Sequence, residues 1–312
     1  MPKKRDAEDM KRFTVVGLGE LLWDLFPGGK QLGGAPANFA YMTSLLGDEG
    51  LVASRVGTDA LGRSAARRLQ RLGLKSSYLQ LDTSHPTGTV KVEVDSAGQP
   101  TFEFAESVAW DFLQWTTEWH DLAEQADAIC FGSLAQRCPR SRATVRAFLD
   151  AVPRRAVRVF DVNLRQAFYS AETLDESLRL TDIVKMNQDE LPEVVKLLAH
   201  PSGDEETSAK WLRSAYKLKL VCVTRGAMGS LLVSEKEKIR HQGCKVRVAD
   251  TVGSGDAFTA ALVYHYLRQG SLATLSEAAN RMGAWVASQT GATPPRDNRR
   301  LERIRSAVAG ED

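Results

Sequence analysis

One segment places an acidic residue beside a glycine-rich turn, at the start of a predicted helix. Residues 250–258 read DTVGSGDAF, and an apolar stretch continues to Leu267. Such a turn offers unpaired N–H groups and the positive end of a helix dipole, which together bind an anion such as phosphate. Asp256 is then either a favourable first-turn carboxylate or a base that takes a proton from a hydroxyl beside the anion. Spacing alone leaves these interpretations level.

Two segments nearer the N-terminal end carry groups suited to a ligand rich in hydroxyls. Residues 33–40 read GGAPANFA, in which paired glycines permit close approach of the backbone and Asn38 offers a donor and an acceptor. Because Pro36 suits the first turn of a helix, an ordinary helix start is the alternative interpretation. Residues 19–24 read GELLWD, so acids follow the first predicted strand, where open α/β sheets bind ligands.

A fourth segment, DVNLR at residues 161–165, follows a run of β-branched residues. If the strand continued through it, Asp161, Asn163 and Arg165 would point to one side and converge on one site. A structural salt bridge with capping is the alternative.

The elements that must position these residues alternate between strand and helix. Apolar runs predict strands at 13–18, 51–55, 128–131, 157–162, 183–186 and 220–224, and three- and four-residue spacing predicts helices at 35–46, 60–72, 141–152, 189–199 and 205–215. Continuous rather than alternating hydrophobicity favours an α/β layered fold with a mainly parallel sheet. Residues 87–107 instead read as a hairpin with a turn at 95–98, and a shorter pair is expected at 21–32.

Composition and missing motifs exclude several classes of function. The 41 Lys and Arg against 39 Asp and Glu give a net charge of +2, which provides no electrostatic case for nucleic acid or an anionic membrane as the main partner. Walker A, dinucleotide-fingerprint, GxSxG and HExxH motifs are absent. The four cysteines show no metal spacing and fit a reducing cytoplasm, while residues 1–12 lack an apolar signal and read as a frayed tail.

Several motifs in order resemble those of one family. The stretch from about Phe13 to Arg300 resembles the ribokinase-like, or PfkB, family of carbohydrate kinases, and most closely its fructokinases. GGAPANFA is similar to the family's N-terminal signature and DTVGSGDAF to its C-terminal one. Between them stand VGTDALG (56–62), PTGTV (86–90), DVNLR, NQDE (187–190) and VTRGAMG (223–229). The resemblance implies a three-layer α/β/α sandwich with a mainly parallel sheet and a small β-sheet lid, in a single domain at 13–312.

The resemblance also implies a role for each matching residue. Asp256 would be the catalytic base, and the backbone N–H groups of Gly253, Ser254 and Gly255 would bind the transferring phosphoryl group. The residues expected to contact the sugar are Asp24, Gly33, Gly34, Asn38, Asn163 and Arg165. Phe102 and Phe104 would cover its apolar face, although packing in a core or a dimer explains them equally well. The nucleotide would be bound by Asn187, Glu190, Thr224, Gly226, Gly229 and Asn280.

The implied reaction is ATP-dependent phosphorylation of a primary hydroxyl, with D-fructose as the expected sugar. Glu190 would organise Mg²⁺ through water, and Asp250 with the carbonyl of Val252 would bind K⁺. Other family substrates, namely 2-keto-3-deoxygluconate, ribose or a nucleoside, are the alternatives, followed by a non-catalytic sensor of sugar or nucleotide. A homodimer through the lid is expected, and neither nucleic acid nor a membrane is expected as a partner.

Overall fold

A nine-stranded sheet forms the centre of the computed structural model, which describes residues 11–94, 100–199 and 203–307. Its strands are β1 (Thr14–Leu18), β4 (Glu49–Gly57), β5 (Leu79–Asp82), β8 (Ala128–Phe131), β9 (Val157–Asp161), β10 (Ile183–Asn187), β11 (Leu220–Thr224), β12 (Ser230–Ser234) and β13 (Lys238–His241). The order is β13-β12-β11-β10-β9-β8-β1-β4-β5. From β11 to β5 all neighbours are parallel, whereas β12 and β13 add an antiparallel edge.

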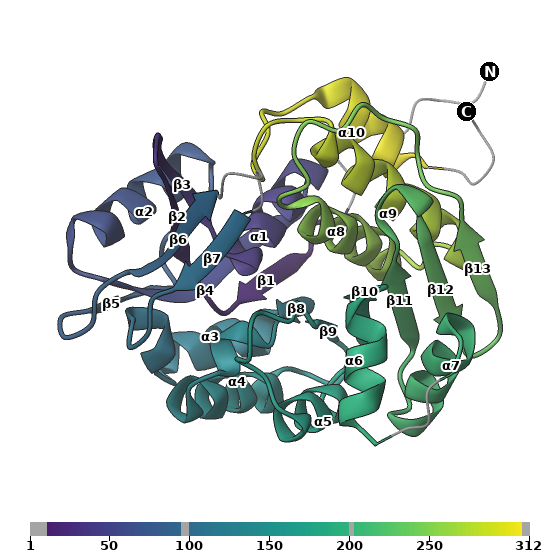
Figure 1. The fold of residues 1–312 in the computed structure, drawn as a ribbon, viewed down its shortest axis with the longest axis horizontal. Helices are drawn as coiled ribbons and strands as arrows, with labels where there is room; N and C mark the ends of the chain where they lie inside the picture. The colour runs from purple at the N-terminus through teal and green to yellow at the C-terminus, as the bar shows by residue number, and fades with distance from the viewer. Residues whose placement is uncertain (1–10, 95–99, 200–202, 308–312) are drawn as a thin grey trace.

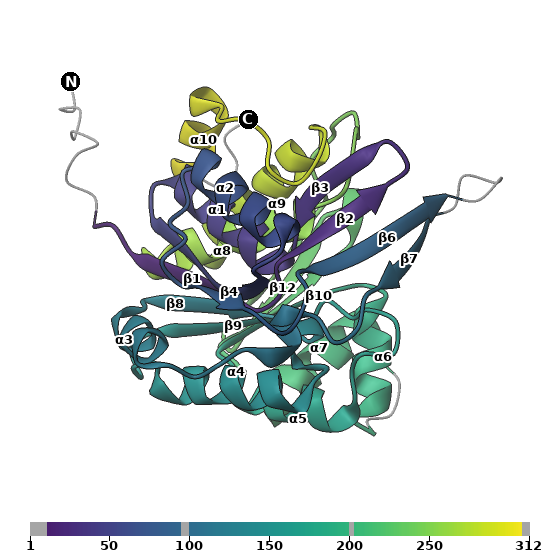
Figure 2. The same ribbon diagram turned by 90° about the vertical axis from the view of Figure 1, so that its left-hand side faces the viewer.

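Helices cover both faces of this sheet, as Figures 1 and 2 show. One face carries α1 (Ala35–Leu46), α2 (Ala60–Arg71), α8 (Ser254–Leu267), α9 (Leu272–Ala287) and α10 (Asn298–Arg305). The other carries α3 (Thr117–Gln125), α4 (Pro139–Ala151), α5 (Ala171–Arg179), α6 (Glu190–Leu197) and α7 (Glu205–Ala215). Three short 3₁₀ turns, η1 (Ala109–Phe112), η2 (Leu134–Gln136) and η3 (Gly226–Met228), complete the described helices. The predicted three-layer α/β/α class is confirmed.

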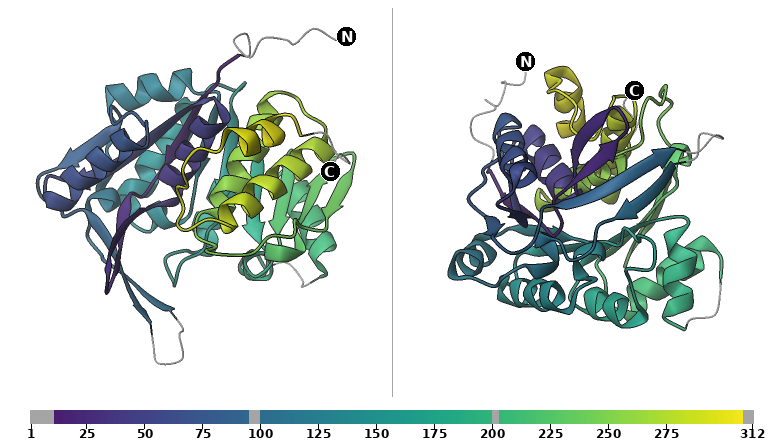
Figure 3. Two further views of the ribbon diagram at one scale, coloured as in Figure 1. Left: turned by 90° about the horizontal axis from the view of Figure 1, so that it is seen from above. Right: turned by 60° about the vertical axis from the view of Figure 1, so that its left-hand side comes forward.

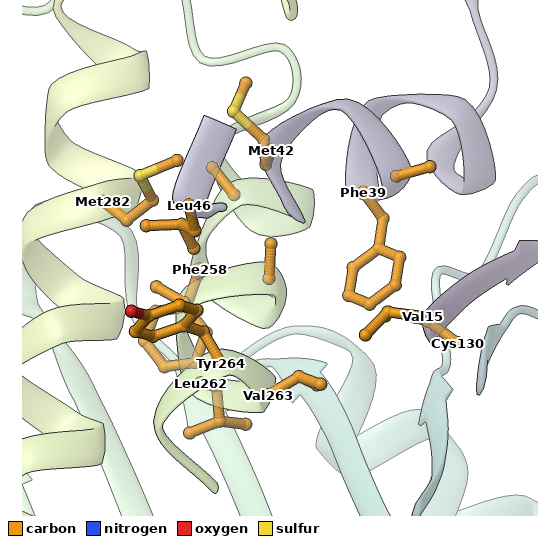
Figure 4. Close-up of a cluster of buried hydrophobic side chains, with 14 of the residues drawn as sticks. Val15, Phe39, Met42, Leu46, Cys130, Phe258, Leu262, Val263, Tyr264 and Met282 are labelled. Atoms are coloured by element: carbon orange, nitrogen blue, oxygen red, sulfur yellow. The ribbon is translucent and has the colours of Figure 1, made fainter. Parts of the chain in front are cut away.

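Apolar packing on each face of the sheet fixes how the helices lie. Figure 4 shows part of the cluster between α1, α8, α9 and the sheet, where Phe39 and Met42 from α1 pack near Phe258 and Leu262 from α8. These side chains are at most 4% exposed. Burial on this scale stabilises a fold by about 1.5–3 kcal/mol for each large apolar side chain. The relative position of α1 and α8, which carry candidate site residues, therefore rests on this core.

A second, smaller sheet stands apart from the central one. Its strands are β2 (Leu22–Phe26), β3 (Gly29–Gly33), β6 (Gly88–Val94) and β7 (Pro100–Phe104), in the order β3-β2-β6-β7. The two views in Figure 3 show it projecting from the layers. The strands occupy the segments in which the sequence predicts extended pairs, while the expected turn at 95–98 and most of the expected N-terminal tail lie outside the described residues.

Several element boundaries differ from the sequence prediction. The strand expected at 157–162 ends at Asp161, and the helix expected at 189–199 spans Glu190–Leu197 because Ala199 takes a left-handed φ of 55°. The helix expected at 141–152 begins two residues earlier, at Pro139, which the first turn of a helix accepts readily. Among the described residues, no helix combines the length and the hydrophobicity needed to cross a membrane.

Candidate active site

The candidate residues gather where the parallel strands end. Since neighbouring parallel strands run in one direction, their carboxyl ends share an edge, and ligands of open α/β sheets bind there. Asp24 lies in β2 of the small sheet, shortly after β1, and Arg165 follows β9, while Asn187 and Thr224 end β10 and β11 as direct partners in register. The first turn of α8 brings Asp256 to the same region. Segments more than 200 residues apart in sequence thus build one site.

The start of α8 has the geometry of an anion site. Gly253 is the N-cap residue with a left-handed φ of 77°, and a Cβ at this position would lie 2.6 Å from the Cβ of Ala292. The N–H and the hydroxyl of Ser254 both donate to the carbonyl of Thr251, at 3.2 and 2.7 Å, which fixes the turn. The first turn of a helix leaves N–H groups without intrahelical partners, and the helix dipole favours negative charge there.

Asp256 faces residues 33–40, the segment that is predicted to bind a ligand rich in hydroxyls. The side-chain amide of Asn38, a buried residue of α1, donates to Asp256 Oδ2 at 2.8 Å. A Cβ on Gly33 would lie 2.4 Å from Asp24 Oδ2, and one on Gly34 would lie 2.5 Å from the carbonyl oxygen of Glu20. Only glycine permits these approaches. Asp24, Gly33, Gly34, Asn38 and Asp256 are therefore neighbours, as the sequence predicts.

Burial raises the pKa of the carboxyl groups at this site. Desolvation, followed by the negative charge of Asp161, raises the pKa of Asp256 from 3.8 to about 6, although Asn38, Lys185 and Arg165 oppose the shift. Desolvation also raises the pKa of Asp24 to about 6, against the effect of Arg165. A carboxylate with a pKa near 6 is a better proton acceptor than an ordinary aspartate and still ionises at neutral pH. A carboxylate in this position is therefore suited to accept a proton from a bound hydroxyl.

A buried ion pair beneath the anion site agrees with the salt-bridge interpretation of Asp161, but its partner, Lys185, was not predicted from the sequence. Lys185 Nζ contacts Asp161 Oδ1 at 2.9 Å, and Thr259 of α8 donates to Asp161 Oδ2 at 3.0 Å. A Cβ on Gly255 would lie 2.9 Å from Lys185 Nζ, so the ammonium lies directly against the first turn of α8. Burial lowers the pKa of Lys185, but the charges of Asp161, Glu190 and Asp256 outweigh it. The sign of this pair in the sequence is a lysine inside the otherwise apolar strand β10.

The predicted convergence of Asp161, Asn163 and Arg165 through strand alternation is wrong. Strand β9 ends at Asp161, and Asn163 takes a left-handed φ of 46°, so the alternation stops before the other two residues. Asp161 forms the buried ion pair instead. Arg165 is exposed on the following loop, but its charge lowers the pKa of Asp24 and Asp256, which places it beside the site.

Asn187 and Glu190 hold two loops together at the same edge. Glu190 is 7% exposed, and its carboxylate accepts the N–H groups of Leu164 and Asn187 at 2.9 and 2.8 Å. Asn187 Oδ1 in turn accepts the N–H groups of Asp189 and Glu190. Both carboxylate oxygens already accept a backbone donor, so this pair suits a hydrated Mg²⁺ contacted through water better than a directly ligated ion.

The residues expected to bind the nucleotide lie in two places, at the end of β11 with the turn after it and in α9. Thr224 ends β11, and Gly226 and Gly229 follow it with left-handed φ values of 55° and 84°. A Cβ on Gly229 would lie 2.2 Å from the carbonyl oxygen of His241, so this turn packs closely on the chain after β13. Asn280 is 6% exposed, and its amide donates to Ser230 Oγ at 2.8 Å, so it also joins α9 to β12.

The loop before α8 is fixed by a carboxylate. Asp250 accepts the N–H groups of Val252 and Gly291, each at 3.0 Å, and its own N–H donates to the carbonyl of Ala287. These bonds bring the backbone around Gly291 beside the anion loop. Asp250 and Val252, the residues expected to bind K⁺, therefore lie together beside Gly291, and binding of the ion stays a prediction.

Phe102 and Phe104 lie on the same face of β7 but in different surroundings. Phe102 is 50% exposed, whereas Phe104 packs on Leu22, Val90 and Val92 and meets Phe168 edge to face at 6.0 Å. Packing at the base of the small sheet accounts for Phe104. Contact of either ring with a sugar stays a prediction.

Comparison with known proteins gives the family. The sequence model of the family described as "pfkB family carbohydrate kinase" matches residues 20–299 of this chain. A fructokinase of Klebsiella pneumoniae is 33% identical over 261 residues, covering 79% of this chain and 82% of its own. A sugar kinase of Pyrococcus horikoshii, solved in complex with ATP, superposes with a TM-score of 0.78 at 27% identity, covering 93% of this chain and 99% of that one. A double mutant of a Vibrio cholerae fructokinase, with fructose, ADP and potassium ion bound, gives a TM-score of 0.79 at 27% identity, covering 94% of this chain and 98% of that one. The chain belongs to the pfkB family of carbohydrate kinases.

Proposed function

We propose that this protein is an ATP- and Mg²⁺-dependent fructokinase that phosphorylates the primary 6-hydroxyl of D-fructose. The observation that carries the proposal is the position of Asp256, a carboxyl with a pKa of about 6 in the first turn of an anion-binding helix and 2.8 Å from Asn38 Nδ2. The fructokinase relatives, one of them with fructose and ADP bound, support the choice of sugar.

In the proposed reaction Asp256 accepts the proton of the attacking hydroxyl. The oxygen then attacks the γ-phosphorus in line, and the bond between that phosphorus and the β–γ bridging oxygen breaks. The N–H groups of Gly253 and Gly255 stabilise the charge on the transferring group, because fixed dipoles need no reorganisation. The N–H of Ser254, expected to join them, donates to the carbonyl of Thr251 in this structure. Asn38 orients the carboxylate, and Asp24, Gly33 and Gly34 hold the sugar together with Asn163 and Arg165.

ATP would lie along the ends of β10 and β11. Asn187, Glu190, Thr224, Gly226, Gly229 and Asn280 are the residues proposed to bind it, and Mg²⁺ would neutralise phosphate charge when bound. Exposed apolar side chains support an adenine site, since Met228 is 58% exposed beside the Gly226 turn and Val248 is 55% exposed on the chain leading to α8. Asp250 and the carbonyl of Val252 would bind K⁺ and so stabilise the anion loop.

The small sheet would act as a lid and as a dimer surface. Closure over the sugar excludes water, which competes as a phosphoryl acceptor. Phe26 and Phe102 are 42% and 50% exposed on this sheet, and a hollow of about 460 Å³ lined by Leu25 and Val92 lies on it. Sedimentation of wild type and of Phe102→Ser tests the dimer, and a wild-type monomer at all concentrations contradicts it.

The decisive experiment is a panel of ATP-coupled assays with fructose, ribose, 2-keto-3-deoxygluconate and adenosine, with Mg²⁺ and K⁺ supplied. We expect the highest kcat/KM with fructose. A preference for the ketoacid would transfer the proposal to that substrate, for which the exposed cation of Arg165 is suited. Saturable sugar binding without product would instead indicate a sensor.

A further inference from the structure

The buried side chain of Thr87 fixes the point at which the chain enters strand β6 of the small sheet. Thr87 is 3% exposed, and its N–H donates to Asp59 Oδ2 at 2.7 Å. Its hydroxyl donates to Asp59 Oδ1 at 2.8 Å and accepts the N–H of Gly57 at 3.0 Å. Gly57 ends β4 and Asp59 stands directly before α2, so these three bonds attach the start of β6 to the main body.

Strand β2 of the small sheet is attached at the same place. The indole N–H of Trp23, which is 5% exposed, donates to the carbonyl of Leu61 in the first turn of α2 at 3.0 Å. Strands β2 and β6 are parallel neighbours, and Leu22 lies opposite Gly88 where both begin. The two strands therefore leave the body side by side, and each is tied to the N-terminal end of α2.

Capping of α2 accounts for only part of what Asp59 does. A helix N-cap needs one oxygen for an N–H of the first turn, and Asp59 Oδ1 supplies it to Gly62 at 2.7 Å. Asp204 caps α7 in the same way, through the N–H of Thr207 at 2.7 Å. Burial raises the pKa of Asp59, but the hydrogen bonds from Thr87 and Gly62 outweigh it and hold this pKa below its ordinary value. The two bonds to Thr87 therefore go beyond capping and are made by a carboxylate.

The anchored strands carry residues that are proposed to hold the sugar. Asp24 directly follows Trp23 in β2, and Gly33 of β3 is the register partner of Leu22. Because hydrogen bonds join these strands into one sheet, a shift at its base moves Asp24 and Gly33 relative to Asp256 in α8. A misplacement of about 1 Å in a substrate site can cost about 10²-fold in rate. The attachment to α2 can therefore affect sugar binding through the sheet.

We infer that Asp59 is a positioning residue for the sugar: through Thr87 it fixes the base of the small sheet on α2 and so keeps Asp24 and Gly33 in place. The inference rests on the proposed function, because the ligand that these residues hold is the acceptor sugar. Since α2 carries none of the residues proposed to bind sugar or nucleotide, loss of its cap alone predicts no selective change in KM.

The test uses Asp59→Asn, in which Oδ1 can still cap α2 but an amide N–H replaces the oxygen that faces the N–H of Thr87. KM for the sugar should rise by about tenfold or more, with KM for ATP within about twofold of wild type. Thr87→Val, which removes the hydroxyl, should also raise KM for the sugar, and Thr87→Ser, which keeps it, should remain close to wild type. The matched control is Asp204→Asn, which alters a cap of the same hydrogen-bond length on the other face of the central sheet and should leave both KM values unchanged.

Hydrogen exchange separates the possible failures, because it tests the attachment without a substrate. In Asp59→Asn the amides of β6 should exchange faster than in wild type, and those of α2 at the wild-type rate. Faster exchange confined to α2 would show a capping role only. A wild type that phosphorylates no sugar of the panel refutes the proposed function, and the role in sugar binding with it, whatever the exchange shows. If the wild type is active, an unchanged KM for the sugar in Asp59→Asn and Thr87→Val, or equal rises in both KM values, would refute the positioning role.

Discussion

Asn38 Nδ2 donates to Asp256 Oδ2 at 2.8 Å and so joins two helices across 218 residues of sequence. Asn38 lies in α1 and Asp256 in the first turn of α8, and these helices pack through the apolar cluster of Figure 4. The bond has two consequences. It fixes the direction of the carboxylate, and it lowers a pKa that burial raises.

Asp256→Asn should abolish most turnover and leave nucleotide binding nearly intact. The amide keeps the shape of the side chain but cannot accept the proton, and loss of a positioned base costs about 10²- to 10⁴-fold. Kcat and the dissociation constant of ATP, measured on the same preparation, check this. A kcat within a few-fold of wild type would refute the assignment of the base.

The pH dependence should reveal the same carboxyl. Since Asp256 acts when deprotonated, kcat/KM should fall below a pH of about 6. Asn38→Ala removes a bond that favours the charged form, so the acid limb should move to higher pH, and kcat/KM at neutral pH should fall by about tenfold. Asn280→Ala is the control, because it truncates an equally buried asparagine whose amide donates to Ser230. It should leave the acid limb in place.

Periodicity and motif order were sufficient to predict the layers and which segments lie together at the candidate site. The helices at 35–46 and 205–215 have their predicted bounds because each has a clear start signal, Pro36 in the first turn of α1 and Asp204 as the N-cap of α7. Asp24, Asn38 and Asp256 were predicted as neighbours because the motifs that contain them stand in the order of a known family.

Pairwise relationships could not be read from the sequence. The turn at Asn163 depends on a left-handed φ that an asparagine tolerates but does not require, so the alternation of DVNLR was extended too far. The sequence shows Lys185 only as one cation in an apolar strand, and its ion pair with Asp161 of the neighbouring strand depends on the packing. The bonds from Thr87 to Asp59 are likewise a property of the packed state.

Asp256 should make the enzyme less stable at higher pH. Its pKa is about 6 in the folded state against 3.8 ordinarily, so between these values the folded state binds more protons than the unfolded one. Stability therefore falls as pH rises from about 4 to 7. A difference of about 2 between the two pKa values corresponds to at most about 3 kcal/mol in the free energy of unfolding. In urea unfolding, the stability of Asp256→Asn relative to wild type should therefore be greater at pH 8 than at pH 4. An equal difference at both pH values would contradict this.

Lys185→Met should destabilise the protein by about 3–5 kcal/mol, because it leaves Asp161 buried and unpaired. Adding Asp161→Asn should restore part of the loss, and a double-mutant cycle measures the coupling. The control is Lys219→Met. This lysine pairs with Asp182 at the same 2.9 Å but is 51% exposed, so its loss should cost at most about 1 kcal/mol. In Lys185→Met the acid limb of kcat/KM should also move to higher pH, since Lys185 lowers the pKa of Asp256.

Gly253→Ala should lower activity because it changes the geometry of the anion site, and not because of backbone strain. Gly253 and Gly73 have the same φ of 77°, so alanine costs a similar backbone strain of about 1–2 kcal/mol at both positions. The surroundings differ, because a Cβ at Gly73 meets nothing within 4 Å, whereas one at Gly253 would lie 2.6 Å from Ala292. Relieving that contact must move the loop that carries the phosphoryl-binding N–H groups. We expect Gly253→Ala to lower kcat by about 10²-fold or more, as loss of an oxyanion donor does, and Gly73→Ala to lower only the unfolding midpoint. Equal kinetic losses in the two variants would show that strain, and not the geometry of the anion site, is responsible.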